Sequence, residues 1–160
     1  MRTFYTYLLI AFLSPLSLFA KNTVQNTTEA VEGKTSYSFL LHTPEGASTE
    51  KQPVFVFLHG RSLCGHNLDR VKRYGLIYAM NKGTEVPGIV IAPQTQGKWN
   101  ADKVMEVVDY VLKNNPTADS TRIYVCGMSL GGYGTMEVVG KYPNRIAAAD
   151  RKSTRLNSSH

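Results

Sequence analysis

The sequence is poor in the residues that mark several common kinds of functional site. It has two cysteines, four histidines and one tryptophan in 160 residues, and its histidines and cysteines do not fall at the spacings of a metal site. It contains no Gly-Lys-Ser/Thr run of a phosphate-binding loop and no block of Lys and Arg interleaved with aromatic residues. No internal repeat is visible. We therefore expect no metal, no cofactor and no nucleic-acid partner.

The first twenty residues have the layout of a signal peptide. Arg2 precedes the uncharged stretch "FYTYLLIAFLSPLSLFA", which ends in Ala20 directly before Lys21. A membrane anchor is the competing interpretation, but the apolar run is short of the roughly 20 residues that span a bilayer, and Pro15 interrupts it. The sequence predicts a signal peptide over 1–20, a secreted or periplasmic product and no stable membrane anchor.

The two cysteines allow one disulfide in such an oxidising compartment. Cys126 lies in an apolar segment and is expected to be a small buried hydrophobic residue. A Cys64–Cys126 bridge is the alternative, which the sequence leaves open because it does not fix the distance between them.

The last eleven residues, Asp150 to His160, differ from the rest of the chain. This stretch, "DRKSTRLNSSH", has no apolar periodicity and resembles the translation of a common sequencing adaptor over its whole length. A natural polar tail is the alternative. We interpret residues 150–160 as an artefact and expect the natural sequence to be readable as far as Ala149. Without Arg2 and this tail the formal charge falls from +6 to +3, which leaves little basis for an acidic partner.

The remaining sequence alternates between strand-like and helix-like segments. Residues 21–34 are polar and are expected to form a loose lead-in. A helix is expected over 99–116, because four valines fall on one face, and patchy helical spacing extends over 67–83. Another helix is expected over 129–143, and strands within 35–46, 53–60, 87–94, 121–127 and 145–149. This order predicts an α/β fold with a mainly parallel sheet over 35–149, broken off before its later strands.

A glycine-serine motif joins the strand at 121–127 to the following helix. Gly127 and Gly131 flank Ser129 in the pattern G-x-S-x-G, and their missing Cβ atoms allow a sharp turn that exposes the serine hydroxyl. The helix that begins there offers free N–H groups to a developing oxyanion. A dinucleotide-binding loop would need glycine in place of Ser129. A second feature agrees, since His59 and Gly60 end an earlier buried strand, where another oxyanion donor is expected.

The segments "VFVFLHG", "IVIAPQ" and "RIYVCGMSLGGYGT" resemble the α/β-hydrolases of the carboxylesterase, dienelactone-hydrolase and prolyl-oligopeptidase-like group. The resemblance covers residues 35–149. It implies that Ser129 is the nucleophile and that the backbone N–H groups of Leu130 and Arg61 are the oxyanion donors, with Ser62 as the alternative to Arg61. Many relatives continue H-G-x-G at this loop, whereas this sequence has Arg61 and Ser62 after Gly60.

The same resemblance implies an acid and then a histidine after the serine. Between Ser129 and Ala149 the only acid is Glu137, inside the expected helix, and there is no histidine. Asp150 and His160 have the right order but belong to the suspected adaptor.

The other histidines precede the serine. His59 is expected to hold the oxyanion loop and His66 to line a loop, while Trp99 is expected to pack in the core or wall the pocket.

The leading hypothesis is an exported serine hydrolase that cleaves small carboxylic esters through an acyl-enzyme on Ser129. A serine peptidase of the prolyl-oligopeptidase type, acting on short peptides, is the close alternative. A non-catalytic binding protein with the same fold is the third hypothesis.

Overall fold

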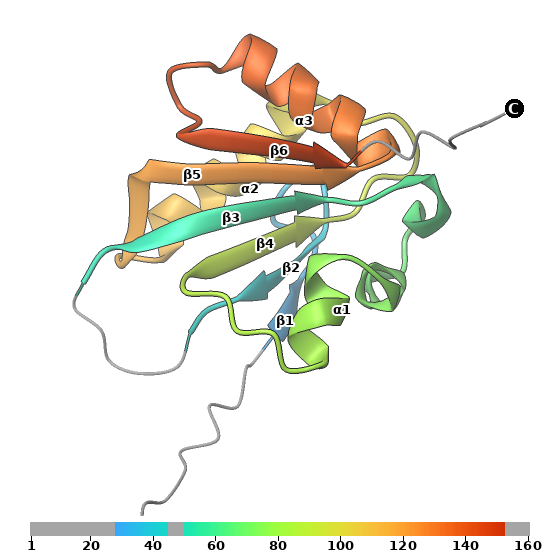
Figure 1. The fold of residues 1–160 in the computed structure, drawn as a ribbon, viewed down its shortest axis with the longest axis horizontal. Coiled ribbons are helices and arrows are strands. Elements are labelled where there is room, and N and C mark those ends of the chain that lie inside the picture. Colours follow the sequence, from blue (N-terminus) through green and yellow to red (C-terminus); the bar gives the residue numbers. More distant parts are fainter. Residues whose placement is uncertain (1–27, 45–49, 153–160) are drawn as a thin grey trace, which may run out of the picture.

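The computed structural model describes residues 28–44 and 50–152 of the chain. Six strands form one sheet in the order β1-β2-β4-β3-β5-β6 (Figure 1). Their bounds are β1 Thr28–Val31, β2 Phe39–His42, β3 Gln52–Leu58, β4 Ile89–Pro93, β5 Ala118–Met128 and β6 Ala148–Lys152. β4, β3, β5 and β6 run parallel to one another, whereas β1 and β2 are antiparallel to their neighbours. The predicted α/β class with a mainly parallel sheet is confirmed.

Helices cover both faces of the sheet. Helices α2 (Ala101–Asn114) and α3 (Leu130–Lys141) pack on one face, and the short α1 (Leu76–Asn81) with the 3-10 segment η2 (Leu68–Arg73) packs on the other. The four valines predicted to form the buried face of α2 are all fully buried: Val104, Val107, Val108 and Val111. Asn100 caps this helix by accepting the N–H groups of Asp102 and Lys103.

Two expectations about the elements were wrong. Part of the supposed lead-in is strand β1, which pairs with β2 from Thr28 to Val31; as an outer strand with largely exposed side chains, it needs no apolar pattern. The helical segment over 67–83 is broken between η2 and α1. Gly75 causes the break, because its φ of 80° is unsuited to a helix and an added Cβ would overlap the ring of Phe57.

Strand β6 ends the described part of the chain and differs from the other strands. It confirms the strand expected near 145–149, but it begins at Ala148 and continues over Asp150, Arg151 and Lys152. Backbone pairing with β5 depends little on side chains, so the strand extends into the suspected adaptor. All five of its residues are exposed.

The predicted signal peptide over 1–20 and the end of the tail lie outside the described residues. Over 28–44 and 50–152, no helix has the length and hydropathy needed to cross a bilayer. The boundary at Ala149 between natural sequence and suspected adaptor is not tested by the fold and stays a prediction.

Candidate active site

Ser129 stands at the junction of β5 and α3 in a strained backbone conformation. Its φ of 52° and ψ of −113° make it the one non-glycine residue with positive φ in the described part of the chain. Such a conformation costs about 1–3 kcal/mol and persists where the surrounding structure enforces it, most often at functional sites. The side chain of Ser129 is exposed. The turn therefore holds a hydroxyl at the carboxyl edge of the parallel strands, where active sites of α/β folds form.

Two glycines permit this turn, as the motif predicted. A Cβ on Gly127 would overlap the carbonyl of Gly131, and a Cβ on Gly131 would overlap the carbonyl of Leu58 at the end of β3. The helix thus starts in direct contact with the neighbouring strand. Any larger residue at either position would push α3 away from the sheet.

The predicted oxyanion donors lie on one side of this turn. Leu130 is the first residue of α3 and Arg61 is the first residue of the 3-10 turn η1 (Arg61–Leu63). First-turn N–H groups have no partner inside their own helix and are available to a ligand. Both residues line a hollow of about 390 Å³ together with Trp99 and Tyr133. Ser129 itself lines a smaller hollow with Gly132, Tyr133 and Arg151, so Tyr133 borders both hollows.

His59 fixes the loop that carries Arg61. The ring is buried, its Nε2 accepts the N–H of Thr95 at 3.2 Å, and its Nδ1 lies 2.8 Å from the carbonyl oxygen of Gly60. Because an N–H can only donate, Nε2 is the acceptor and Nδ1 carries the proton. Burial lowers the pKa of His59, and the charge of Arg70 lowers it further. The neutral ring holds the loop, as the sequence analysis expected, and is no base for Ser129.

Further contacts hold the rest of this loop. Arg70 donates to the carbonyl of Ser62 at 2.8 Å, and Gln94 donates to the carbonyl of Leu63 at 2.8 Å. The hydroxyl of Tyr74 lies 2.7 Å from that of Ser62. The loop is thus fixed in advance of any ligand, which is what an oxyanion site requires.

Trp99 packs in the core and also lines a hollow, the two roles considered for it from the sequence. It is buried, and its Nε1 donates to the carbonyl of His59 at 3.1 Å. A Cβ on Gly134 of α3 would lie 2.7 Å from the indole, so the helix packs closely on the ring. The same ring lines the hollow beside Leu130.

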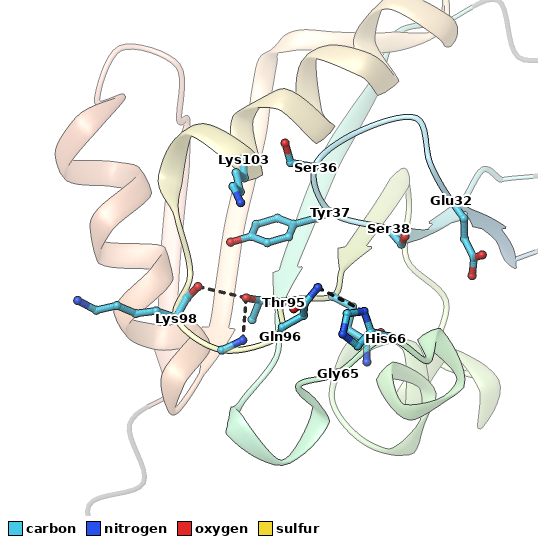
Figure 2. A pocket seen from close by; sticks show the side chains of 12 residues that line it. Glu32, Ser36, Tyr37, Ser38, Gly65, His66, Thr95, Gln96, Lys98 and Lys103 are labelled. Carbon is cyan, nitrogen blue, oxygen red and sulfur yellow. Dashed lines mark hydrogen bonds between the residues drawn. The ribbon is translucent and has the colours of Figure 1, made fainter.

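His66 lies in a different, polar hollow of about 320 Å³ at the same edge of the sheet. Figure 2 shows His66 and Gln96 pointing toward each other, joined by a 3.3 Å contact between Nδ1 and the amide nitrogen. The hydroxyl of Thr95 donates to the carbonyl of Lys98, which lines both hollows. The lining of the polar hollow does not include Ser129.

The described residues contain no acid and base pair for Ser129. Glu137, the one acid between Ser129 and Ala149, accepts the N–H of Ala101 at 3.4 Å at the start of α2. Asp150 lies in β6, and His160 is outside the described residues. Within 28–44 and 50–152, no group of three metal-ligating side chains is present either.

Cys64 and Cys126 are both free thiols, so the alternative of a bridge between them is not realised. Burial, with the nearby Asp150 as the lesser cause, raises the pKa of Cys126 to about 11. Cys126 was expected to be a small buried hydrophobic residue; it packs against the apolar cluster that includes Val71 and Ile77, with its side chain half-buried. Cys64 contacts the carbonyl of Gly97 instead.

The chain is similar in sequence to a known protein family and to a curated peptidase. The model of the prolyl oligopeptidase family matches residues 91–152, which include the serine turn. An uncharacterized peptidase of Bacillus subtilis (strain 168), YuxL, is 30% identical over 116 residues, covering 66% of this chain and 17% of that protein.

Two solved structures have a similar arrangement of strands and helices. S-formylglutathione hydrolase from Staphylococcus aureus has a TM-score of 0.63 at 19% identity, covering 79% of this chain and 57% of that one. The chain has the α/β-hydrolase fold. An acylaminoacyl peptidase of Pyrococcus horikoshii agrees, with a TM-score of 0.60 at 19% identity over 82% of this chain and 24% of its own.

The chain spans 17% of the length of its curated relative and 57% of the hydrolase structure. The comparisons thus bear on the part of the fold that carries the serine turn.

Several residues of the site were missed by the sequence analysis. Arg70, Tyr74, Gln94 and Thr95 all contact the oxyanion loop or its histidine. Gln94 and Thr95 directly follow the buried strand β4, and polar residues at that position are a usable signal because parallel strands end at one edge. Arg70 and Tyr74 lie where the expected helix is broken, so helical spacing does not predict which way their side chains point.

Proposed function

We propose that the full-length protein is an exported serine hydrolase that cleaves carboxylic ester bonds through an acyl-enzyme on Ser129. The observation that carries the proposal is the strained, exposed serine at the end of β5, next to the first N–H groups of α3. The family match over residues 91–152 and the fold of the solved hydrolases support it.

The chemistry follows from the positions of the groups. The Ser129 oxygen bonds to the carbonyl carbon of the ester, and the electron pair of the C=O bond moves to its oxygen. The N–H groups of Leu130 and Arg61 stabilise that negative charge, a contribution of about 3–4 kcal/mol per donor in related sites. Collapse of the intermediate expels the alcohol, and water later releases the acid.

The proton acceptor for Ser129 is proposed to be a histidine imidazole, held by an acid, from sequence after Ala149. Support comes from two observations. Glu137 is engaged at the start of α2, and this chain spans only 57% of a solved hydrolase with the same arrangement. Sequencing the gene past the codon for Ala149 tests this: the proposal expects an Asp or Glu and then a His, and their absence would contradict it.

Labelling with a fluorophosphonate probe tests the nucleophile. The full-length protein is expected to label, and Ser129→Ala to abolish labelling. Ser120→Ala is the matched control, because Ser120 is an exposed serine near the opposite end of the same strand. A folded wild-type protein that does not label would favour the non-catalytic binding hypothesis.

A peptidase is the second candidate, and two findings favour it: the match to the prolyl oligopeptidase family and the peptidase relative. Turnover of p-nitrophenyl esters and of peptide p-nitroanilides by the full-length protein separates the two. We expect the larger kcat/KM with esters; the reverse order would replace ester cleavage with peptide cleavage.

Export is proposed from residues 1–20. N-terminal sequencing of the protein expressed in its own host is expected to begin at Lys21. A mature protein that begins at Met1 would contradict export through a cleaved signal peptide.

A further inference from the structure

The polar hollow of about 320 Å³ at the end of β4 contains none of the groups assigned to the reaction at Ser129. Lys98 lines both this hollow and the one beside Leu130, so the two are neighbours at the carboxyl edge of the sheet, where α/β folds bind ligands. In the sheet, β4 is separated from β5 by β3, and two strand spacings amount to about 10 Å. A substrate that fills the polar hollow must therefore extend well beyond the carbonyl that Ser129 attacks.

The lining of this hollow is polar throughout. It comes from residues within 32–38, 65–66 and 94–103, and apart from Gly65 and Gly97 each of them carries an oxygen or nitrogen in its side chain. Most sites for small molecules are lined mainly by apolar and aromatic side chains. An apolar acyl chain would leave these polar groups without partners, whereas a ligand rich in hydrogen-bonding groups would satisfy them.

Gln94 is a buried member of this lining with an acceptor to offer. The residue is 5% exposed, and its amide nitrogen donates to the carbonyls of Leu63 at 2.8 Å and Asn67 at 2.9 Å. Because these two bonds use both amide protons, the amide oxygen is the atom that remains for a ligand. That oxygen requires a donor, such as a hydroxyl group.

His66 offers the opposite kind of group. Its Nδ1 lies 3.3 Å from the amide nitrogen of Gln96. The amide nitrogen can only donate, so Nδ1 accepts and Nε2 carries the ring proton. The hollow thus combines a donor at His66 with acceptors at Gln94 and at the carboxylate of Glu32. A hydroxyl group can both donate and accept, and it therefore suits such a mixed lining.

The charges around the hollow favour a neutral ligand over an anion. Figure 2 shows the side chain of Lys98 extending away from the other labelled side chains, while its carbonyl accepts the hydroxyl of Thr95. The ammonium of Lys103 lies 5.7 Å from the centre of the Tyr37 ring, and the lining also contains the carboxylate of Glu32. One cation and one anion leave no net charge to attract a carboxylate or a phosphate.

We propose that the polar hollow binds a sugar ring and that the ester cleaved at Ser129 is an acylated carbohydrate. This inference rests on the proposed function and names its substrate class. The Ser129 oxygen bonds to the acyl carbon, and the bond from that carbon to the sugar oxygen breaks. The sugar oxygen takes the proton that the histidine base removed from Ser129. Hydroxyl groups of the ring in the hollow donate to Gln94 and Glu32 and accept from His66.

Two soluble acetates of similar length test the proposal with the full-length protein. One is a methyl cellobioside with a single acetyl group on O6 of its non-reducing ring. The other is the acetate of tetraethylene glycol monomethyl ether, which has no hydroxyl groups. The kcat/KM for the sugar ester is expected to exceed that for the glycol ester at least about tenfold, since each hydrogen bond to a buried or charged partner contributes roughly that factor.

Variants of the lining test where the preference arises. Glu32→Ala and His66→Phe are each expected to lower the ratio of the two kcat/KM values about tenfold, through a higher KM for the sugar ester. Glu29→Ala is the matched control, because Glu29 is exposed in β1 and does not line the hollow. It should keep the wild-type ratio, and melting temperatures check that all three variants fold.

Three results would overturn the inference while leaving the proposed function intact. In the first, the wild-type protein cleaves both acetates with equal kcat/KM. In the second, Glu32→Ala and His66→Phe lower both kcat/KM values in proportion, which would mean that these residues only support the fold. In the third, 6-acetoxyhexanoate is cleaved faster than the sugar ester, which would assign the hollow to an anion. A wild-type protein that neither labels with fluorophosphonate nor cleaves any ester or peptide would instead contradict the proposed function itself.

Discussion

The nucleophile strand β5 has very different neighbours on its two sides. On one side lies β3, whose residues Val54, Val56 and Leu58 are fully buried and whose last carbonyl touches Gly131. On the other side lies β6, whose five residues are all exposed. Both pair with β5 through parallel backbone hydrogen bonds. The serine turn thus packs against buried residues on the β3 side, whereas the β6 strand on its other side is exposed and accepts the N–H of Ser129 at the carbonyl of Lys152, 2.9 Å away.

This asymmetry bears on what part of the site the chain contains. At the helix start, Gly131 lies against Leu58 of β3, whereas a Cβ on Gly132 would lie 3.5 Å from the Cβ of Arg151 in β6. The groups that a serine hydrolase adds from later strands would approach from the β6 side. The following variants compare the β3 side and the β6 side of the serine turn in the full-length protein.

The largest effect is expected from Gly131→Ala, on the β3 side. The added Cβ would overlap the carbonyl of Leu58, so we expect a loss of at least about 3 kcal/mol in the free energy of unfolding. Gly140→Ala, on the same helix, is the matched control because nothing lies within 4 Å of its Cβ position. It should gain up to about 1 kcal/mol. Urea denaturation measures both, and equal effects would contradict the close contact.

The next effect concerns the β6 side. If later strands cover β6 in the full-length protein, Ala149→Asp buries a carboxylate and should lower the free energy of unfolding by about 2 kcal/mol or more. In the chain as it stands, Ala149 is exposed. Thermal denaturation of the full-length variant checks the expectation. An unchanged melting temperature would mean that β6 remains an open edge.

The 160-residue chain itself is expected to aggregate and to be inactive. An unpaired edge beside the nucleophile strand can pair with other molecules, and no described histidine can serve Ser129. Light scattering as a function of protein concentration and an ester assay measure these properties. A soluble, active chain of this length would contradict both the truncation and the adaptor interpretation.

A smaller effect is expected from pH, through His59. Burial lowers the pKa of His59 in the folded state, so below about pH 6.5 the unfolded chain binds a proton that the folded chain does not. The stability contributed by the neutral ring is complete above that pH and is lost as the pH falls, by at most about 1.4 kcal/mol per pH unit. His59→Gln should flatten the dependence of unfolding free energy between pH 7.5 and 5.5. An equally steep dependence in the variant would assign it to other groups.

The smallest effect is expected at the exposed ion pair between Lys141 and Asp102, which links α3 to α2. The pair holds the pKa of Asp102 below and that of Lys141 above the ordinary values. Both side chains are more than half exposed, so solvent screens the interaction. Lys141→Met should leave the melting temperature within experimental error. A clear drop would mean that surface charge holds these helices together.

The sequence was most informative where local pattern and packing agree. The valine face of α2, the buried runs of β3 and β4, and the G-x-S-x-G turn could all be predicted, because periodicity and missing Cβ atoms act over a few residues. Strand β1 could not, since an outer strand with exposed side chains needs no apolar pattern. The contact of Tyr74 with Ser62 could not either, because it depends on the break at Gly75, which packs against Phe57 of β3.

Capture of the acyl-enzyme tests whether Ser129 is the nucleophile. The full-length protein is treated with p-nitrophenyl acetate, quenched in acid and digested, and the peptides are measured by mass spectrometry. We expect one acetyl group on the peptide that contains Ser129 and none in Ser129→Ala. Turnover of the ester with the acetyl group on another residue, or undiminished turnover by Ser129→Ala, would contradict it.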